Sequence, residues 1–165
     1  MSLSFMQADS SSKKPIYIAI LLSLLVGGLG GAATEIGPWY FQLQKPSWQP
    51  PDWLFGPAWT TIYVATSIAG VKAWRRADEV QRRYFMGALL LNLVLNLLWS
   101  LIFFTSQRPD IALIEVVPLW LSILLMVLLV RGFSPVSAWL MMPYLCWVAF
   151  AAYLNWTIVK LNAPF

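Results

Sequence analysis

Aromatic side chains recur at helical spacing in two apolar segments, and such side chains suit contact with a flat apolar molecule. Phe55, Trp59 and Tyr63 are four residues apart, so they share one face of a helix. Trp147 and Ala151 have the same spacing, which places a large flat ring beside a small residue. This pair could line a slot for a planar apolar ligand, or it could be a knob beside a packing hollow, and the spacing leaves both open.

A third apolar segment carries polar side chains, which are costly in hydrocarbon unless they face protein or a cavity. Asn92 and Asn96 are four residues apart, and Trp99 continues nearly the same face. Their amides are expected either to hydrogen-bond to neighbouring helices or to contact a polar ligand. Glu115 lies one turn into the next apolar segment, where it either reaches the membrane interface or takes part in proton or ion movement.

The segment before the first aromatic face is rich in tryptophan and proline, and residues 45–60 read KPSWQPPDWLFGPAWT. Pro50 and Pro51 favour an extended backbone before the next helix, and they prevent that helix from beginning earlier in the chain. Asp52 follows where a carboxylate can cap the next helix and meet the positive end of its dipole. The sequence therefore predicts an extended loop, a cap at Asp52 and then a helix, whose aromatic face could equally serve as an interfacial belt.

The chain has no histidine and one cysteine, Cys146. It lacks the commonest metal ligand and general base, and it has no cysteine cluster for zinc or iron–sulfur. We expect neither a metal site nor a resident cofactor, and we expect Cys146 to behave as a small apolar residue.

The composition decides which class of protein must position these residues. Of 165 residues, 59% are apolar and 11% charged, against about 25% charged in soluble domains. Such a chain cannot cover a globular surface with polar groups, which excludes a soluble enzyme domain, a disordered regulator and a nucleic-acid-binding module. The long apolar runs also exclude an outer-membrane barrel, whose strands alternate. We predict an all-α integral membrane protein.

Each span needs about 20 mostly apolar residues, and the charges divide the chain into a bundle of five transmembrane helices, at about 16–35, 54–73, 84–104, 111–131 and 136–160. A polar tail, 1–14, precedes one membrane domain, 15–165, and the Trp/Pro-rich loop is 36–53. The first apolar run also loosely matches a signal peptide. Because four similar spans follow and no clear cleavage site ends the run, we expect it to be retained as a helix.

Positive charge gathers on one side of this predicted bundle, which explains the net charge of +4 without a nucleic-acid partner. The N-terminal side holds Lys13, Lys14, Lys72, Arg75, Arg76, Arg82, Arg83 and Arg131, and the other side holds Lys45, Arg108 and Lys160. The positive-inside rule then predicts a cytoplasmic N-terminus. We expect a bacterial cytoplasmic (inner) membrane, with a bacterial outer membrane or an organelle membrane as the alternative.

A string of aromatics and prolines, from Trp48 through Pro50, Pro51 and Phe55 to Trp59, resembles the signature of the TspO/MBR family, the family of the translocator protein. Further matches are WY at 39–40, NLLWSLIFF at 96–104 and PYLCWVAFAAYLNW at 143–156. The likeness extends from about residue 28 to residue 162.

This resemblance implies a five-helix bundle, commonly a homodimer, with a pocket that opens toward the first loop and binds porphyrins, sterols or synthetic ligands. Carried over by position, with Trp48 and Phe55 added from the string, the candidate ligand-binding residues are Tyr40, Trp48, Pro50, Pro51, Phe55, Trp59, Asn92, Asn96, Trp99, Trp147 and Ala151.

The function that the resemblance favours is tetrapyrrole binding, in porphyrin handling or stress-linked regulation. The first alternative is an enzyme that degrades porphyrin with light and oxygen, with Trp59 and Trp147 as the catalytic residues. The second is a transporter of tetrapyrroles, sterols or other lipophiles. Sterol binding ranks lower, because six residues separate Tyr153 from Lys160, one more than the usual sterol pattern permits. Leu91 four residues after Gly87 puts a dimer on that helix face in doubt.

Overall fold

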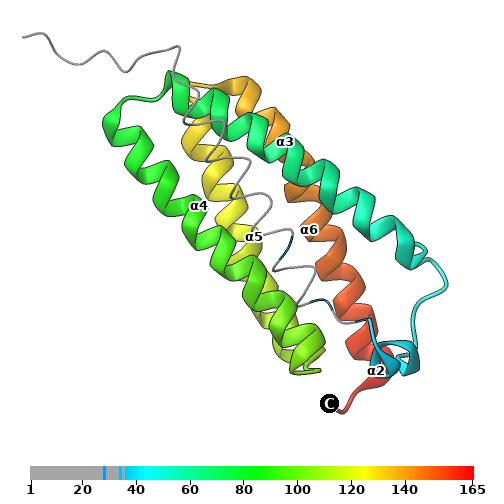
Figure 1. Ribbon diagram of the computed structural model, residues 1–165. Helices are drawn as coiled ribbons and strands as arrows, with labels where there is room; N and C mark the ends of the chain where they lie inside the picture. The colour runs from blue at the N-terminus through cyan, green and yellow to red at the C-terminus, as the bar shows by residue number, and fades with distance from the viewer. Residues whose placement is uncertain (1–27, 29–33, 35) are drawn as a thin grey trace, which may run out of the picture.

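The computed structural model describes residues 28, 34 and 36–165. In order along the chain, the elements are α2 (Pro38–Gln42), η1 (Asp52–Leu54, a 3₁₀ turn), α3 (Phe55–Arg76), α4 (Glu79–Ser100), η2 (Leu101–Thr105, a π-helical turn), α5 (Pro109–Arg131) and α6 (Pro135–Asn162) (Figure 1). The described part of the chain contains helices and no strands.

Four of these segments are long and apolar enough to cross a membrane, namely Asp52–Arg76, Glu79–Thr105, Pro109–Arg131 and Pro135–Asn162. The predicted helical membrane bundle is therefore confirmed, and the chain is an integral membrane protein. The first of the five predicted spans, 16–35, lies outside the described residues except for Gly28 and Thr34. The polar tail 1–14 also lies outside them.

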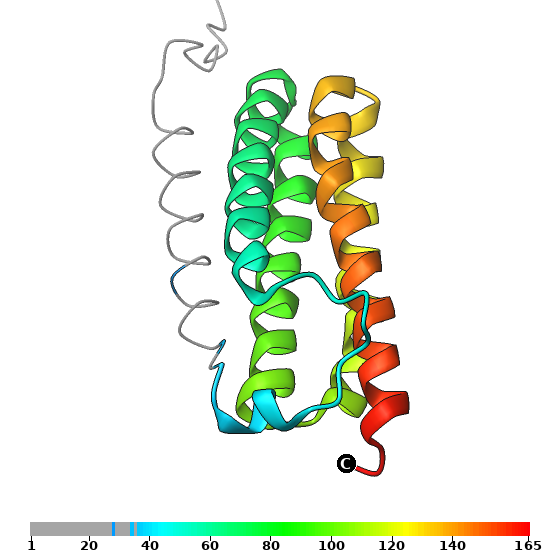
Figure 2. The ribbon, with the colours of Figure 1, turned by 90° about the vertical axis from the view of Figure 1, so that its right-hand side faces the viewer.

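The packing of the four long helices leaves α3 and α4 apart. α5 packs against both α4 and α6, while α3 packs chiefly on α6 and makes little contact with α4. Figure 2 shows α3 and α4 on the same side of α5 and α6, and Figure 1 shows α3 and α4 apart from each other. Although a short turn joins α3 to α4, α3 packs on α6 and α4 packs on α5. The space between α3 and α4 is therefore available for a site.

Local sequence explains where the helices begin. The Asp78 carboxylate accepts a hydrogen bond from Gln81 N at 2.8 Å, and Gln81 Oε1 accepts one from Asp78 N at 3.0 Å. This capping box starts α4 at Glu79. The prediction began five residues later, at 84, because the first turns of the helix are charged and do not look like part of an apolar span. Pro109 and Pro135 stand in the first turns of α5 and α6, where the missing N–H has no cost.

The segment 36–53, predicted as an extended loop, contains the short helix α2 and ends in η1. It runs between the end of α4 and the C-terminal end of α6, which lie at the same end of the bundle (Figure 2). Two reciprocal bonds fix it there: Gln44 N donates to Asn162 Oδ1 at 2.8 Å, and Asn162 Nδ2 donates to Gln44 O at 2.9 Å. One side chain of α6 therefore holds the backbone of this segment.

Replacing Asn162 by alanine is expected to loosen this attachment without unfolding the bundle. The Gln44 amide should exchange its hydrogen faster, by up to about tenfold, because a lost hydrogen bond is worth about 0.5–1.5 kcal/mol. Hydrogen–deuterium exchange followed by mass spectrometry measures this, with Gln42→Ala at a neighbouring exposed position as the control. Equal exchange in both variants would show that Asn162 does not hold the segment.

Candidate functional site

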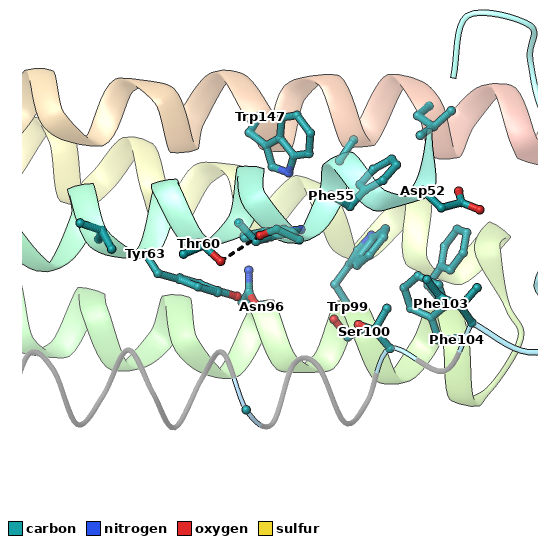
Figure 3. A pocket seen from close by; sticks show the side chains of 18 of the residues that line it. Asp52, Phe55, Thr60, Tyr63, Asn96, Trp99, Ser100, Phe103, Phe104 and Trp147 are labelled. Atoms are coloured by element: carbon teal, nitrogen blue, oxygen red, sulfur yellow. Dashed lines mark hydrogen bonds between the residues drawn. The ribbon is translucent and has the colours of Figure 1, made fainter. Parts of the chain in front are cut away.

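A cavity of about 1340 Å³ occupies the space between α3, α4 and α6 (Figure 3). The turn η1 and one face of α3 line it from Asp52 to Arg75, and α4 with η2 and the C-terminal half of α6 supply the other sides. The side chains of this lining that the structure describes include Tyr40, Asp52, Phe55, Trp59, Thr60, Tyr63, Lys72, Arg75, Asn96, Trp99, Ser100, Phe103, Phe104, Trp147, Ala151, Leu154, Asn155 and Ile158.

The first aromatic wall, made by α3 and α6, comprises Phe55, Trp59, Tyr63 and Trp147. The Trp59 and Tyr63 rings stack with centroids 5.4 Å apart. Phe55 meets Trp147 edge to face at 5.7 Å, which joins the two helices. The predicted aromatic face of residues 55, 59 and 63 is confirmed, because all three line the cavity.

The second aromatic wall, made by α4 and η2, comprises Trp99, Phe103 and Phe104. Trp99 stacks on Phe103 at 5.1 Å, and Phe103 and Phe104 are 4.8 Å apart. Figure 3 shows Trp147 and Phe55 on the α3 and α6 side and these three rings on the α4 side. The cavity thus lies between two aromatic surfaces that belong to different helices.

A polar cluster of Tyr40, Lys45, Gln49 and Asp52 lies at one end of the cavity, where Tyr40 and Asp52 line it. Tyr40 Oη donates to Asp52 Oδ1 at 2.8 Å, and Gln49 Nε2 donates to the same carboxylate oxygen at 3.1 Å. Lys45 Nζ lies 3.9 Å from Asp52 Oδ2 and 3.5 Å from the centre of the Tyr40 ring. Burial, and then the bond to Asp52, raise the pKa of Tyr40, so this phenol stays a neutral donor.

The predicted cap at Asp52 is wrong. Pro51 occupies the N-cap position of η1 and Leu54 that of α3, and neither helix start has a side-chain cap bond. The Asp52 carboxylate turns instead to Tyr40, twelve residues earlier in the chain. It therefore ties α2 to the start of α3, which is a tertiary contact rather than a local one.

The two asparagines of α4 have different surroundings. Asn96 lines the cavity, and its Nδ2 donates to Tyr144 Oη at 3.0 Å. Asn92 is 2% exposed; its Nδ2 donates to Ser122 Oγ at 2.9 Å, and its Oδ1 accepts from Tyr144 Oη at 3.2 Å. Asn92 therefore joins α4 to α5 and α6, and it is not among the residues that line the cavity.

Seven of the eleven predicted ligand-binding residues line the cavity, and they come from four separate elements: Tyr40, Phe55, Trp59, Asn96, Trp99, Trp147 and Ala151. Trp48, Pro50, Pro51 and Asn92 do not. Trp48 instead stacks on Tyr153 with centroids 5.1 Å apart, on α6. Spacing within a loop does not reveal which helix the ring of Trp48 will contact.

The list of candidate ligand-binding residues left out some lining residues that the spacing itself indicated. Tyr63 and Asn155 continue the four-residue steps of Trp59 and Ala151, so the same periodicity finds them. Phe103 lies four residues after Trp99 in the same way. Lys72 and Arg75 had no such signal, because charged residues near a helix end are common in membrane proteins for other reasons.

The chemistry available to this cavity is binding by stacking, with a few polar anchors. Indole and phenyl rings present flat apolar surfaces, and Tyr40, Asn96 and Asn155 add hydrogen-bonding groups. The described residues contain no cluster of three or more acidic or cysteine side chains that could hold a metal ion. The lining is thus suited to a large, flat and mostly apolar ligand that carries polar groups at its rim.

Comparison with known proteins gives a consistent result. The model of the TspO/MBR family matches residues 19–161. The chain is 42% identical to the tryptophan-rich protein TspO of Chlorobaculum tepidum, over 88% of this chain and 94% of the relative. It is 31% identical to a tryptophan-rich sensory protein of Cereibacter sphaeroides, over 89% and 91% of the two chains, and 32% identical to the human translocator protein, over 75% of each. The chain belongs to the TspO/MBR family.

Proposed function

We propose that the cavity binds a tetrapyrrole of the porphyrin type and that the protein handles or senses porphyrin in its membrane. The observation that carries this proposal is the pair of aromatic walls on either side of a cavity of about 1340 Å³. Sites for drug-sized ligands measure about 300–1,000 Å³, so this cavity has room for a larger molecule. A macrocycle is flat on both faces, which matches stacking from two sides.

The polar groups of the cavity also support a porphyrin. Lys72 and Arg75 line it at the end opposite Tyr40 and Asp52, where they could pair with carboxylate side chains of the ring. Asn96 also lines the cavity, and its amide can bond to a polar substituent of the macrocycle. One relative carries the name of a sensory protein, which supports a regulatory role for this chain.

A titration of the purified protein with protoporphyrin IX in the dark, read by tryptophan quenching, tests the proposal. We expect saturable quenching in the wild type and about two- to tenfold weaker binding in Trp99→Leu and in Trp147→Leu, because an aromatic contact is worth about 0.5–1.5 kcal/mol. Trp139→Leu is the matched control, since Trp139 is 73% exposed on α6 and does not line the cavity. Quenching that never saturates would contradict the proposal.

A second candidate function, the degradation of porphyrin with light and oxygen, has one specific observation in its favour. Trp59 and Trp147, the two predicted catalytic residues, both line the cavity, on adjacent helices. An indole stacked on a macrocycle can exchange an electron with its excited state. Illumination of the bound complex should then bleach the porphyrin faster than illumination of the free compound. The acceleration should be lost in Trp147→Phe with binding retained.

We further propose that the N-terminus faces the cytoplasm of a bacterial inner membrane. The arginines of the α3–α4 turn lie at one end of the bundle, and the 36–53 segment lies at the other (Figure 2). Arg131, at the turn between α5 and α6, lies at the same end as the α3–α4 turn. By the positive-inside rule this basic end is cytoplasmic, so the polar cluster around Asp52 faces the opposite side.

A further inference from the structure

A continuous series of aromatic rings leads from the cavity to the outside of α6. Trp147 lines the cavity, and its ring lies 5.5 Å from that of Phe150. Phe150 is 6.0 Å from Trp48, and Trp48 stacks on Tyr153 at 5.1 Å with 18° between the ring planes. Tyr153 is 56% exposed, so the series connects a lining residue to an open phenol.

The types of these residues suit one-electron chemistry. Tryptophan and tyrosine are the side chains that most readily lose a single electron when they are in contact with an oxidant. Phenylalanine is not oxidised under the same conditions, so Phe150 acts as a bridge between Trp147 and Trp48. Trp48 comes from the 36–53 segment, which the two bonds between Gln44 and Asn162 hold against α6.

We propose that Trp147, Trp48 and Tyr153 conduct an oxidising equivalent from a tetrapyrrole in the cavity to the surface of α6. This inference rests on the proposed function. The excited tetrapyrrole takes one electron from Trp147, and dioxygen then takes that electron from the reduced ring and becomes superoxide. Trp48 reduces the Trp147 radical cation. Tyr153 reduces Trp48 and releases its phenolic proton to water. A diffusible donor of one hydrogen atom, such as a thiol, restores Tyr153.

The neighbours of Tyr153 favour it as the end of the path. Trp156 lies 5.6 Å further along, but Lys160 Nζ is 3.9 Å from the centre of the Trp156 ring. A second positive charge on that indole is disfavoured by the ammonium group beside it. Tyr153 avoids this cost because it loses a proton together with the electron, and it stacks on Trp48 of the 36–53 segment, a residue outside the spanning segments, where that proton can leave.

Trp59, in the same aromatic wall as Trp147, reaches no exposed phenol through its ring contacts among the described residues. Its ring contacts Tyr63 at 5.4 Å and Tyr144 at 5.9 Å. Tyr144 is 3% exposed, and its hydroxyl is engaged with Asn92 and Asn96. Tyr144 is therefore poorly placed to release a proton, and Tyr63 is half-buried, so the contacts of Trp59 favour transfer to the surface less than those of Trp147 do.

The experiment illuminates the full-length protein with bound protoporphyrin IX in air, after a dark titration has established saturable binding. Electron paramagnetic resonance of frozen samples detects tyrosyl radicals, and mass spectrometry measures oxidised Trp147. We expect a tyrosyl signal in the wild type that is lost in Tyr153→Phe and in Trp48→Phe. Both variants should bind porphyrin as the wild type does and should accumulate oxidised Trp147 severalfold faster.

Matched controls are Tyr84→Phe and Trp139→Phe, because both residues are exposed, at 66% and 73%, and neither contacts another ring in the described part of the chain. Both controls should behave as the wild type. Saturable binding with a radical yield that is unchanged in Tyr153→Phe would overturn this inference alone. Absence of saturable binding in the dark would overturn the proposed function and this inference with it.

Discussion

Replacing Ala151 by tryptophan is expected to abolish tetrapyrrole binding while the helices remain folded. Ala151 lines the cavity one helical turn after Trp147, so a second indole at this position occupies the space beside the first aromatic wall. A rigid macrocycle cannot adapt to a narrower slot, and we expect affinity to fall by at least about 100-fold, or about 2.7 kcal/mol. Tryptophan quenching in the dark titration measures the loss.

The control for this variant is Ala149→Trp, which adds the same indole to the same helix at an exposed position that does not line the cavity. It should bind protoporphyrin IX as the wild type does. Circular dichroism should show unchanged helix content in both variants. If Ala151→Trp bound porphyrin with wild-type affinity, the ligand could not occupy the space between the two aromatic walls.

Sequence periodicity predicts the aromatic walls well, because they depend on geometry within one helix. The spacing of Phe55, Trp59 and Tyr63 determines that they share a face, whatever packs against it. The same spacing places Ala151 beside Trp147, and both line the cavity. What the periodicity leaves open is whether such a face meets a ligand or another helix, and the separation of α3 from α4 decides this.

Contacts between distant residues decide the rest of the site, and no local pattern contains them. Asp52 has the sequence context of a helix cap, yet its partner Tyr40 is twelve residues away. Trp48 has the sequence context of a pocket residue, yet it rests on Tyr153 of α6. The start of α4 is a different case, because Asp78 and Gln81 form a local capping box that the sequence alone can indicate. The charged residues that follow it hide this helix start when spans are predicted from uncharged stretches.

Asn92 and Asn96 show most clearly how equal spacing can conceal different roles, and the difference predicts a large effect on stability. Asn92 bonds to Ser122, 30 residues away, and to Tyr144, 52 residues away. In Asn92→Leu the buried Tyr144 hydroxyl loses its acceptor. We expect the free energy of unfolding to fall by about 1–3 kcal/mol, with porphyrin affinity retained because residue 92 does not line the cavity.

Asn96→Leu, one turn away on the same helix, is the comparison variant, and it also loses a hydrogen bond to Tyr144. It removes a polar group from the cavity lining and should weaken porphyrin binding more than Asn92→Leu does. Thermal unfolding in mild detergent and the dark titration separate the two effects. A fall in porphyrin affinity in Asn92→Leu at unchanged stability would mean that Asn92 contacts the ligand.

A double-mutant cycle tests the cause of the stability loss. If the cost of Asn92→Leu comes from the orphaned Tyr144 hydroxyl, then Tyr144→Phe should cost less in the Asn92→Leu background than in the wild type, because the hydroxyl it removes no longer has an acceptor there. Equal costs in the two backgrounds would show that the two residues are not coupled. The coupling would establish that α4 is held to α6 through a hydrogen bond behind the cavity. Asn92, which does not line the cavity, would then help to hold the lining residues Asn96 and Trp99 of α4 in position.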